Sequence, residues 1–455
     1  MLQSDNPYLT GNYAPWREEG DAYDLEVEGE IPSELNGALY RIGPNPHFRP
    51  LGPYHWFDGD GMVHALLLRD GRAAYRNRYV QTAGLRAEMK AGRSLHGGLL
   101  GGAGEDLPPG APAIKNAANT NIIGYANRLL ALWEAGLPHE LRPETLETVG
   151  LFDFGGKMNS PVTAHPKFDA RTGEMLFFGY QVMPPYLTWY RADRDGRLLE
   201  SRVIDTGLPA MLHDFSVTDN YALFFVCPSV FRLENMMKGL PALSWEPEHG
   251  TKIGAMNRKT GELTWFETDA FYIFHFLNAY QEDAKLIVDG CRMPKLDMAG
   301  NSFGSTPMPW RWTLDLKNST VSDHQIDDIS SEFPRFDERL AGRKHRYGYF
   351  DAARGAGDRE FEFNSIVKHD YETGRNEYQD LGGSKVPGEP VFVPRSLGSA
   401  EDDGWILSIW YDATIDRSEL VIQEARDFAA KPVARVKLNH RVPFGFHGNW
   451  VPARQ

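Results

Sequence analysis

The stretch TKIGAMNRKTGELTWFE, residues 251–267, consists of two apolar runs joined by a short polar segment. Runs rich in β-branched and aromatic residues on both sides of a tight polar turn are typical of a β-hairpin. Residues 311–326 have the same form, and a turn of the type Asp-x-x-Thr-Gly occurs in both DARTGEMLF (169–177) and DYETGRNEY (370–378). These hairpins predict an all-β fold.

The same pattern extends outward along the chain. Further strands bounded by turn residues are expected in 128–136, 174–182, 221–229, 284–292 and 404–412, whereas long helical periodicity is scarce. The 45 glycines and 30 prolines are spread throughout, and no linker divides the chain, so residues 1–455 are expected to form one domain. A recurring strand-turn-strand unit is typical of a β-propeller or a large sandwich, and seven blades would have 65 residues each (455/7).

Composition limits the function. A net charge of -14 argues against a nucleic-acid partner, which would require clustered Lys and Arg. Two cysteines, Cys227 and Cys291, give neither a disulfide framework nor a Cys-x-x-Cys metal site, which fits a reducing compartment. The N-terminal residues lack a signal peptide, and no apolar run approaches the roughly 18 residues needed to span a bilayer. We therefore expect a cytoplasmic protein that meets a membrane, if at all, from its surface.

Four histidines lie in settings that suit a metal ligand. His165 precedes a proline in TAHPKFD, His213 precedes an apolar run, His275 lies within FYIFHFLNAY, and His447 lies within FGFHGNW. Burying an imidazole in such surroundings is costly unless its nitrogens are occupied, by a metal on one side and an acceptor on the other. Their separations are 48, 62 and 172 residues (213 − 165, 275 − 213, 447 − 275), and the last is close to three times 57. Ligands that lie one strand unit or a whole number of units apart could all face one axis.

The remaining histidines have other settings. In the segment YHWFDGDGMVHAL (54–66), we expect a structural corner in which Asp58 and Asp60 bind backbone amides. Polar or turn contexts predict surface positions for a further group of histidines, namely His139, His249, His324 and His369.

Three glutamates are placed next to apolar or turn segments: Glu134 in ALWEAG, Glu332 in SEFPRFD and Glu401 in SAEDDGW. A carboxylate that accepts the second N–H of a ligand histidine fixes its tautomer and raises its basicity. Each glutamate taken alone fits a solvated strand end better.

Nine segments together resemble the carotenoid cleavage oxygenase family, in the family's order and from about residue 6 to 451. They are HWFDGDGMVHAL, NTN, LWEAG, AHPK, HDF, FHFLNAY, EFPRFDERLAGRKHRYGYF, EDDGWILS and FHGNW. The resemblance implies a seven-bladed β-propeller in which loops and short helices cap an axial non-haem Fe(II).

By matched motif, the resemblance assigns the iron ligands to His165, His213, His275 and His447. Glu134, Glu332 and Glu401 match the carboxylates that bond three of these imidazoles, and Thr120 matches the threonine whose methyl group crowds one open iron position. Gly448 is then expected to be small because the axis is crowded. The implied reaction is the addition of O2 across a C=C bond, giving two carbonyl products without an organic cofactor.

The resemblance leaves two substrate classes. Stilbene-cleaving members carry a lysine, which binds the phenolic oxygen, at the position of Trp133. Tryptophan carries no charge, so we expect a hydrophobic polyene, a carotenoid or apocarotenoid, with phenolic stilbenes or phenylpropenes as the alternative. A non-catalytic propeller that serves as an interaction module is the alternative from another class. The apolar stretches 182–190 and 234–245 are expected either to line a substrate tunnel and contact a membrane surface or to pack on the propeller rim.

Overall fold

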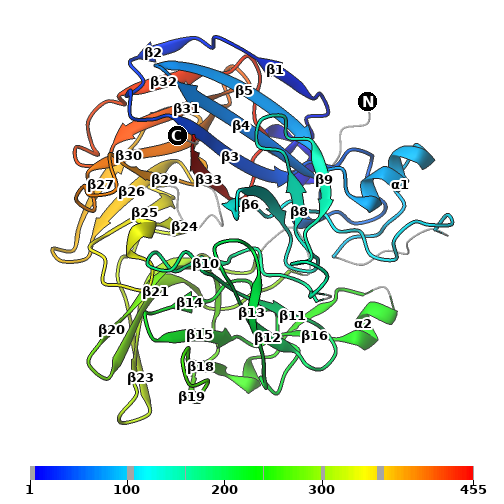
Figure 1. The fold of residues 1–455 in the computed structure, drawn as a ribbon, viewed down its shortest axis with the longest axis vertical. Helices are drawn as coiled ribbons and strands as arrows, with labels where there is room; N and C mark the ends of the chain where they lie inside the picture. Colours follow the sequence, from blue (N-terminus) through cyan, green and yellow to red (C-terminus); the bar gives the residue numbers. More distant parts are fainter. Residues whose placement is uncertain are drawn as a thin grey trace.

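A computed structural model describes residues 6–99, 107–158, 160–238, 240–298, 303–355 and 363–453. Seven antiparallel sheets surround a common axis and form a seven-bladed β-propeller (Figure 1). The sequence-based prediction of this fold is confirmed. Within the described part of the chain, no helix is both long and apolar enough to cross a membrane.

The blades follow one another along the chain. The second to sixth blades are β6–β9 (Asn121–Tyr125, Arg128–Leu132, His139–Leu141, Thr148–Leu151), β10–β13 (Lys167–Phe168, Met175–Tyr180, Leu187–Ala192, Leu198–Ile204), β14, β15, β18 and β19 (Ser216–Val217, Tyr221–Val226, Thr251–Asn257, Leu263–Thr268), β20–β23 (Tyr272–Glu282, Lys285–Met293, Met308–Asp315, Thr320–Gln325) and β24–β27 (Ser331–Arg335, Tyr347–Ala352, Ser365–Asp370, Arg375–Gln379).

Both ends of the chain contribute to the remaining two blades. The first blade has the order β1 (Gly20–Ala22), β5 (Arg72–Tyr79), β4 (Gly61–Arg69), β3 (Gly37–Pro44) and β33 (Gly448–Pro452). The seventh contains β28 (Lys385–Val386), β29 (Val391–Pro394), β30 (Gly404–Asp412), β31 (Arg417–Glu424), β32 (Ala434–Lys437) and β2 (Val27–Gly29). Pairing of β33 with β3 and of β2 with β32 therefore closes the ring twice (Figure 1).

Few of the helices and strands in the described residues lie outside the blades. They are the hairpin β16–β17 (Ser229–Phe231, Leu243–Trp245), the helices α1 (Ala83–Ala91) and α2 (Leu233–Met237), and the 3-10 helices Pro7–Leu9, Gly11–Tyr13, Trp56–Asp58, Pro247–His249 and Glu338–Leu340. The scarcity of helical periodicity in the sequence is thus matched by the described residues.

The predicted hairpins are present. Residues 251–267 form the pair β18–β19 with Gly254 opposite Trp265, and residues 311–326 form β22–β23. The two Asp-x-x-Thr-Gly turns join β10 to β11 and β26 to β27, and in each the aspartate accepts hydrogen bonds from backbone amides of its own turn. The aspartates Asp169 and Asp370 thus stabilise the turns that the sequence indicated.

The innermost strands define the axis. β14 contacts β20, β20 contacts β24, β29 contacts β33, and β33 contacts β6, so the innermost strands of neighbouring blades lie side by side. A side chain placed at the start of any of these strands lies close to the axis. This geometry brings together residues that are far apart in the sequence.

Candidate metal centre

The four predicted histidines meet on the propeller axis. His165 precedes β10 and His213 precedes β14, while His275 lies in β20 and His447 directly precedes β33. One ring nitrogen of each lies within 4.8 Å of those of the others, and all four residues are buried. Four imidazoles converging from four separate blades form a site that can hold one metal ion.

A local irregularity of the backbone accompanies the position of His275. The pairing of β20 with β21 shifts register between Ile273 and Phe276, so His275 lies within a bulge. The partner strand has Gly290 there, where a Cβ atom would come 2.9 Å from the carbonyl oxygen of His275. Bulges turn side chains away from the regular alternation of a strand, and here the bulge accompanies a histidine on the axis.

Gly448 is required for a reason other than the one expected. A Cβ atom at this position would lie 2.6 Å from the carbonyl oxygen of Tyr40 in β3. The crowding therefore comes from the neighbouring strand, and it allows β33 to close the ring directly after His447.

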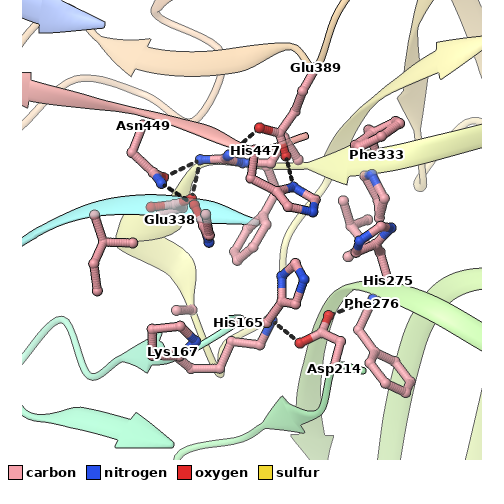
Figure 2. A pocket seen from close by; sticks show the side chains of 18 of the residues that line it. His165, Lys167, Asp214, His275, Phe276, Phe333, Glu338, Glu389, His447 and Asn449 are labelled. Atoms are coloured by element: carbon pink, nitrogen blue, oxygen red, sulfur yellow. Dashed lines mark hydrogen bonds and ion pairs between the residues drawn. The ribbon is translucent and has the colours of Figure 1, made fainter. Parts of the chain in front are cut away.

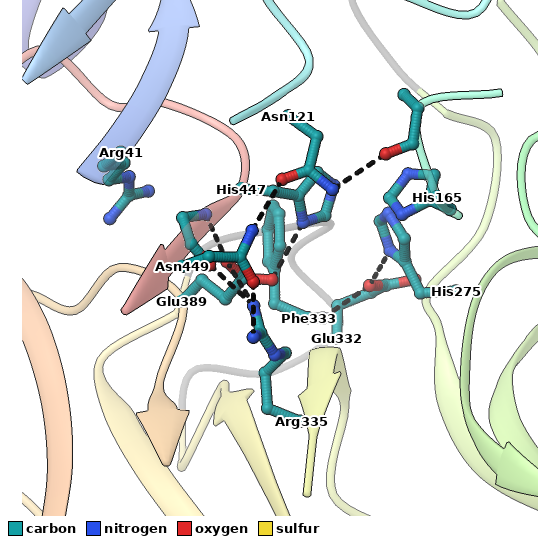
Figure 3. Close-up of polar contacts among 12 residues, drawn as sticks. Arg41, Asn121, His165, His275, Glu332, Phe333, Arg335, Glu389, His447 and Asn449 are labelled. Carbon is teal, nitrogen blue, oxygen red and sulfur yellow. Dashed lines mark hydrogen bonds and ion pairs between the residues drawn. The ribbon is translucent and has the colours of Figure 1, made fainter. Parts of the chain in front are cut away.

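Three carboxylates fix three of the imidazoles, and Figure 3 shows two of these pairs, Glu332 with His275 and Glu389 with His447. The Nδ1 atom of His213 lies 2.5 Å from Glu134 Oε2, that of His275 lies 2.6 Å from Glu332 Oε2, and that of His447 lies 2.8 Å from Glu389 Oε1. With Nδ1 bonded to a carboxylate, the Nε2 atom of each ring is left for a metal. The Nε2 atom of His275 is buried and has no hydrogen-bond partner among the described residues.

The prediction for Glu401 is wrong. Its Oε1 atom accepts hydrogen bonds from the backbone amides of Arg346 and Tyr347, at 2.7 and 2.8 Å, so its role is to hold the start of β25. Glu389, in the segment VPGEPVF (386–392), makes the contact with a ligand histidine that was expected of Glu401. A signal was present in the sequence, because Glu389 follows Glu332 by 57 residues (389 − 332), about one blade, and directly precedes a buried strand.

Three of the four imidazoles, those of His165, His275 and His447, are held in the neutral state that metal binding requires. Burial lowers the pKa of His275 to about 3 and that of His447 to about 4, and it holds the pKa of His165 well below its usual range. Burial also acts on His213, but the carboxylate of Glu134 more than offsets it and raises the pKa. Lone pairs on neutral rings are the form in which histidine binds metals.

Arg335 gives Glu389 a much lower pKa than Glu332. Burial would raise the pKa of Glu389, but Arg335, whose Nη1 atom lies 3.2 Å from Oε2, and His447 lower it to about 2. Glu332 has no such cation, and burial raises its pKa to about 8. Glu389 thus supplies a permanent negative charge beside the four imidazoles, which can moderate the charge of a bound cation.

Thr120 and Trp133 line an aromatic pocket next to the histidines. The pocket has a volume of about 60 Å³ and includes Trp56 and Phe57 from a 3-10 helix of the cap; its other lining residues are Glu134, His213, Phe274, His275, Phe303, Phe333, Phe446 and His447. The hydroxyl of Thr120 donates to Asn119 Oδ1 at 2.9 Å, so this polar group is already engaged. None of the described lining residues is Lys or Arg.

The other histidines are partly as expected. Asp58 accepts from the amides of His55 and Leu99, and Asp60 accepts from that of His47, which confirms the structural corner. His249 and His324 are exposed, as predicted. The surface prediction is wrong for His139 and His369, which are buried because each lies in a strand packed within a blade.

A propeller with four buried imidazoles on its axis, three of them fixed by carboxylates, has a site that can hold a metal ion. Comparison with known proteins gives the family. Residues 13–452 match the family model described as retinal pigment epithelial membrane protein. The chain belongs to the carotenoid cleavage oxygenase family, and it is an oxidoreductase of the dioxygenase type.

Relatives of this chain carry several substrate names. It is 35% identical to carotenoid 9,10(9',10')-cleavage dioxygenase 1 of Phaseolus vulgaris, covering 98% of this chain and 90% of that protein. It is 34% identical to isoeugenol monooxygenase of Pseudomonas nitroreducens, covering 99% of both. The crystal structure of lignostilbene dioxygenase from Pseudomonas brassicacearum superposes with a TM-score of 0.93 at 32% identity, covering 100% of both chains.

Proposed function

We propose that the protein is an Fe(II) dioxygenase that cleaves a C=C bond of a carotenoid or apocarotenoid into two carbonyl products. The ion would be held by His165, His213, His275 and His447, whose ring nitrogens lie close enough together to bind one cation. Imidazole donors suit Fe(II), and all four rings are buried. When bound, Fe(II) supplies the redox chemistry that activates O2.

The surrounding residues orient and protect this site. Glu134, Glu332 and Glu389 would hold three ligand rings in one tautomer and one orientation. Thr120 lies where the aromatic pocket meets the histidines, and its hydroxyl is held by Asn119. We propose that its methyl group restricts access beside the metal, so that the alkene lies at one position and O2 at another.

The aromatic pocket is the observation that favours a polyene. Its walls are mainly Phe and Trp side chains, and Trp133 stands beside Glu134 where a lysine would bind a phenolate. A phenolate in an apolar pocket without a cation would have an uncompensated charge, which costs several kcal/mol or more. A conjugated hydrocarbon has no such cost and gains from burial of its apolar surface.

Phenolic alkenes are the second candidate. The observation in their favour is the likeness to isoeugenol monooxygenase and to lignostilbene dioxygenase, at 34% and 32% identity. A neutral phenol would avoid the cost of burying a charge, and the indole N–H of Trp133 is a hydrogen-bond donor.

A product assay separates the two classes. Protein loaded with Fe(II) without oxygen is given O2 and one of three substrates: a detergent-dispersed apocarotenal, a hydroxystilbene or isoeugenol. Shortened polyene aldehydes, identified by mass, are expected. Hydroxybenzaldehydes in place of polyene aldehydes would reject the proposal and establish the phenolic class.

We also propose that the protein collects its substrate at a membrane surface. Side chains near the β11–β12 and β16–β17 loops are exposed although apolar, including Met183 (60%) and Met237 (81%). The two loops start close together, since the rings of Tyr180 and Phe231 stack 6.0 Å apart. Flotation with phosphatidylcholine vesicles tests this: the protein should float with the vesicles, and Met183→Glu with Met237→Glu should reduce the floating fraction several-fold.

A further inference from the structure

The four histidines lie between two cavities, one lined mainly by aromatic side chains and one that carries several charged side chains as well as apolar ones. The aromatic pocket touches His213 but not His165, and a second cavity of about 110 Å³ touches His165 but not His213. His275, His447 and Phe333 line both cavities. We call the second cavity the polar chamber; its charged residues are Lys167, Asp214, Arg335, Glu338 and Glu389, and its amide residues are Asn121 and Asn449.

The polar chamber runs from solvent to the histidines. Glu338, at one end, has a side chain that is 56% exposed, whereas the side chain of His447 is 6% exposed. Between them lies Arg335, which is 12% exposed. Figure 2 shows the imidazoles of His165, His275 and His447 turned toward one another where this chamber meets the axis.

The charges of the chamber are paired and slightly negative. Lys167 Nζ lies 2.8 Å from Asp214 Oδ1, and Arg335 binds both Glu389 and Glu338. Three carboxylates therefore face two cations. The guanidinium of Arg335 is further occupied by the carbonyl oxygen of Gly448 and by Asn449 Oδ1, at 2.8 and 3.0 Å, which holds it against one wall.

We propose that the polar chamber is the route by which the divalent metal ion enters and leaves the four-histidine site. This inference rests on the proposed metal centre. A hydrated divalent cation loses many kcal/mol of solvation in an apolar environment, so the aromatic pocket is a poor path for it. The polar chamber offers carboxylate oxygens in place of water, beginning with exposed Glu338, and it ends at the unpartnered Nε2 atom of His275.

A substitution at the mouth tests the route by kinetics. Ala341 is half-buried and lines the chamber, so Ala341→Trp would narrow it; Ala429→Trp, on the exposed surface outside the chamber, is the matched control. Co(II) uptake by metal-free protein is followed by absorbance, and its release is followed by capture with excess chelator. Ala341→Trp should slow uptake and release by the same factor, about 10-fold or more, and leave the Kd unchanged, because a narrowed route changes only the barrier.

The charge at the mouth gives a second test. Glu338→Gln should slow Co(II) uptake several-fold at low ionic strength, because it removes a negative charge that attracts the ion. The difference from the unmodified protein should shrink in 0.5 M salt, where the screening length is about 4–5 Å. Glu372→Gln is the matched control, because Glu372 is also exposed (58%) and also pairs with an arginine, Arg346. This control should behave as the unmodified protein.

Blocking the aromatic pocket tests whether the metal ion enters by that pocket instead. Saturating the Co(II)-exchange assay with an apocarotenal should leave the uptake rate unchanged if the metal uses the polar chamber. If the polyene blocks uptake while Ala341→Trp does not, the proposed route is wrong although the metal centre stands. If no Co(II) or Fe(II) binds under any condition, the metal centre itself fails, and the route fails with it.

Discussion

Glu389 binds His447 and the residue after it with its two oxygens: Oε1 accepts from His447 Nδ1 at 2.8 Å, and Oε2 accepts from the backbone N–H of Gly448 at 2.7 Å. One carboxylate thus fixes both an imidazole on the axis and the first residue of the strand that closes the propeller. The seventh blade contributes no ligand histidine, but through Glu389 it holds the ligand from the first blade.

This double contact predicts the effect of Glu389→Gln. The amide offers only one acceptor oxygen, so either His447 Nδ1 or the Gly448 N–H loses its partner, and the charge facing Arg335 is lost. Metal affinity should fall about 10 to 100-fold, as for other carboxylates that orient a ligand histidine. The measurement is Co(II) titration of metal-free protein.

Glu401→Gln is the matched control for that experiment. Glu401 bonds the amides of Arg346 and Tyr347 and none of the four histidines, so its loss should leave metal affinity within about twofold. Equal losses in both variants would mean that the metal site responds to general destabilisation and not to the Glu389–His447 contact.

Features that depend on a local stretch of sequence could be predicted, whereas contacts between separate blades could not. The hairpin turns and the four histidines were identifiable because each motif is local: a polar turn between apolar runs, or an imidazole among aromatic residues. Glu389 and Glu401 differ only in which neighbouring strand faces them, and that depends on how the sixth and seventh blades are placed around the axis. The family resemblance matched Glu401, in the segment SAEDDGW, whereas Glu389, in the segment VPGEPVF, makes the contact with His447.

Burial was harder to predict than chemistry for the same reason. His139 stands among polar residues in LPHELRPE, yet it is only 5% exposed because β8 lies between β7 and β9. Its neighbours in sequence differ from its neighbours in space. Only the sheet order shows that the side chain is enclosed.

Replacing a ligand should remove the metal. His447→Ala deletes one of four imidazoles and leaves Glu389 without its partner on the axis, so metal content after purification and dialysis should fall from near one to less than about 0.1 per chain. Elemental analysis measures it. His249→Ala, at an exposed histidine near Glu246 and Glu248 and outside the four-histidine site, should retain the full metal content.

Trp133 should control the substrate class. Trp133→Lys places an ammonium group in the aromatic pocket beside Glu134, which would stabilise a phenolate and disfavour an apolar chain. The ratio of kcat/KM for a hydroxystilbene to that for an apocarotenal should rise at least 10-fold. Trp133→Phe, which keeps the apolar wall, should leave the ratio within about threefold; a similar change in both variants would show that pocket volume, and not charge, decides.

The contacts of Glu88 with Lys115 and His96 predict how the stability of the fold decreases at low pH. Glu88, on α1, is almost fully buried, and its Oε2 atom lies 2.6 Å from Lys115 Nζ while Oε1 accepts from the Leu95 amide and contacts His96. Burial would raise the pKa of Glu88, but the contacts with His96 and Lys115 lower it to about 2 from an ordinary value near 4.5. The unfolded chain therefore binds a proton more readily than the folded one between these two values. The stabilisation, about 3 kcal/mol at most, is complete above pH 5 and is lost as the pH falls from 4.5 toward 2.

Glu88→Gln should lower the melting temperature of metal-free protein by several degrees at pH 7 and by clearly less at pH 3.5, measured by circular dichroism. An equal decrease at both pH values would show that the loss is one of packing and not of the charge.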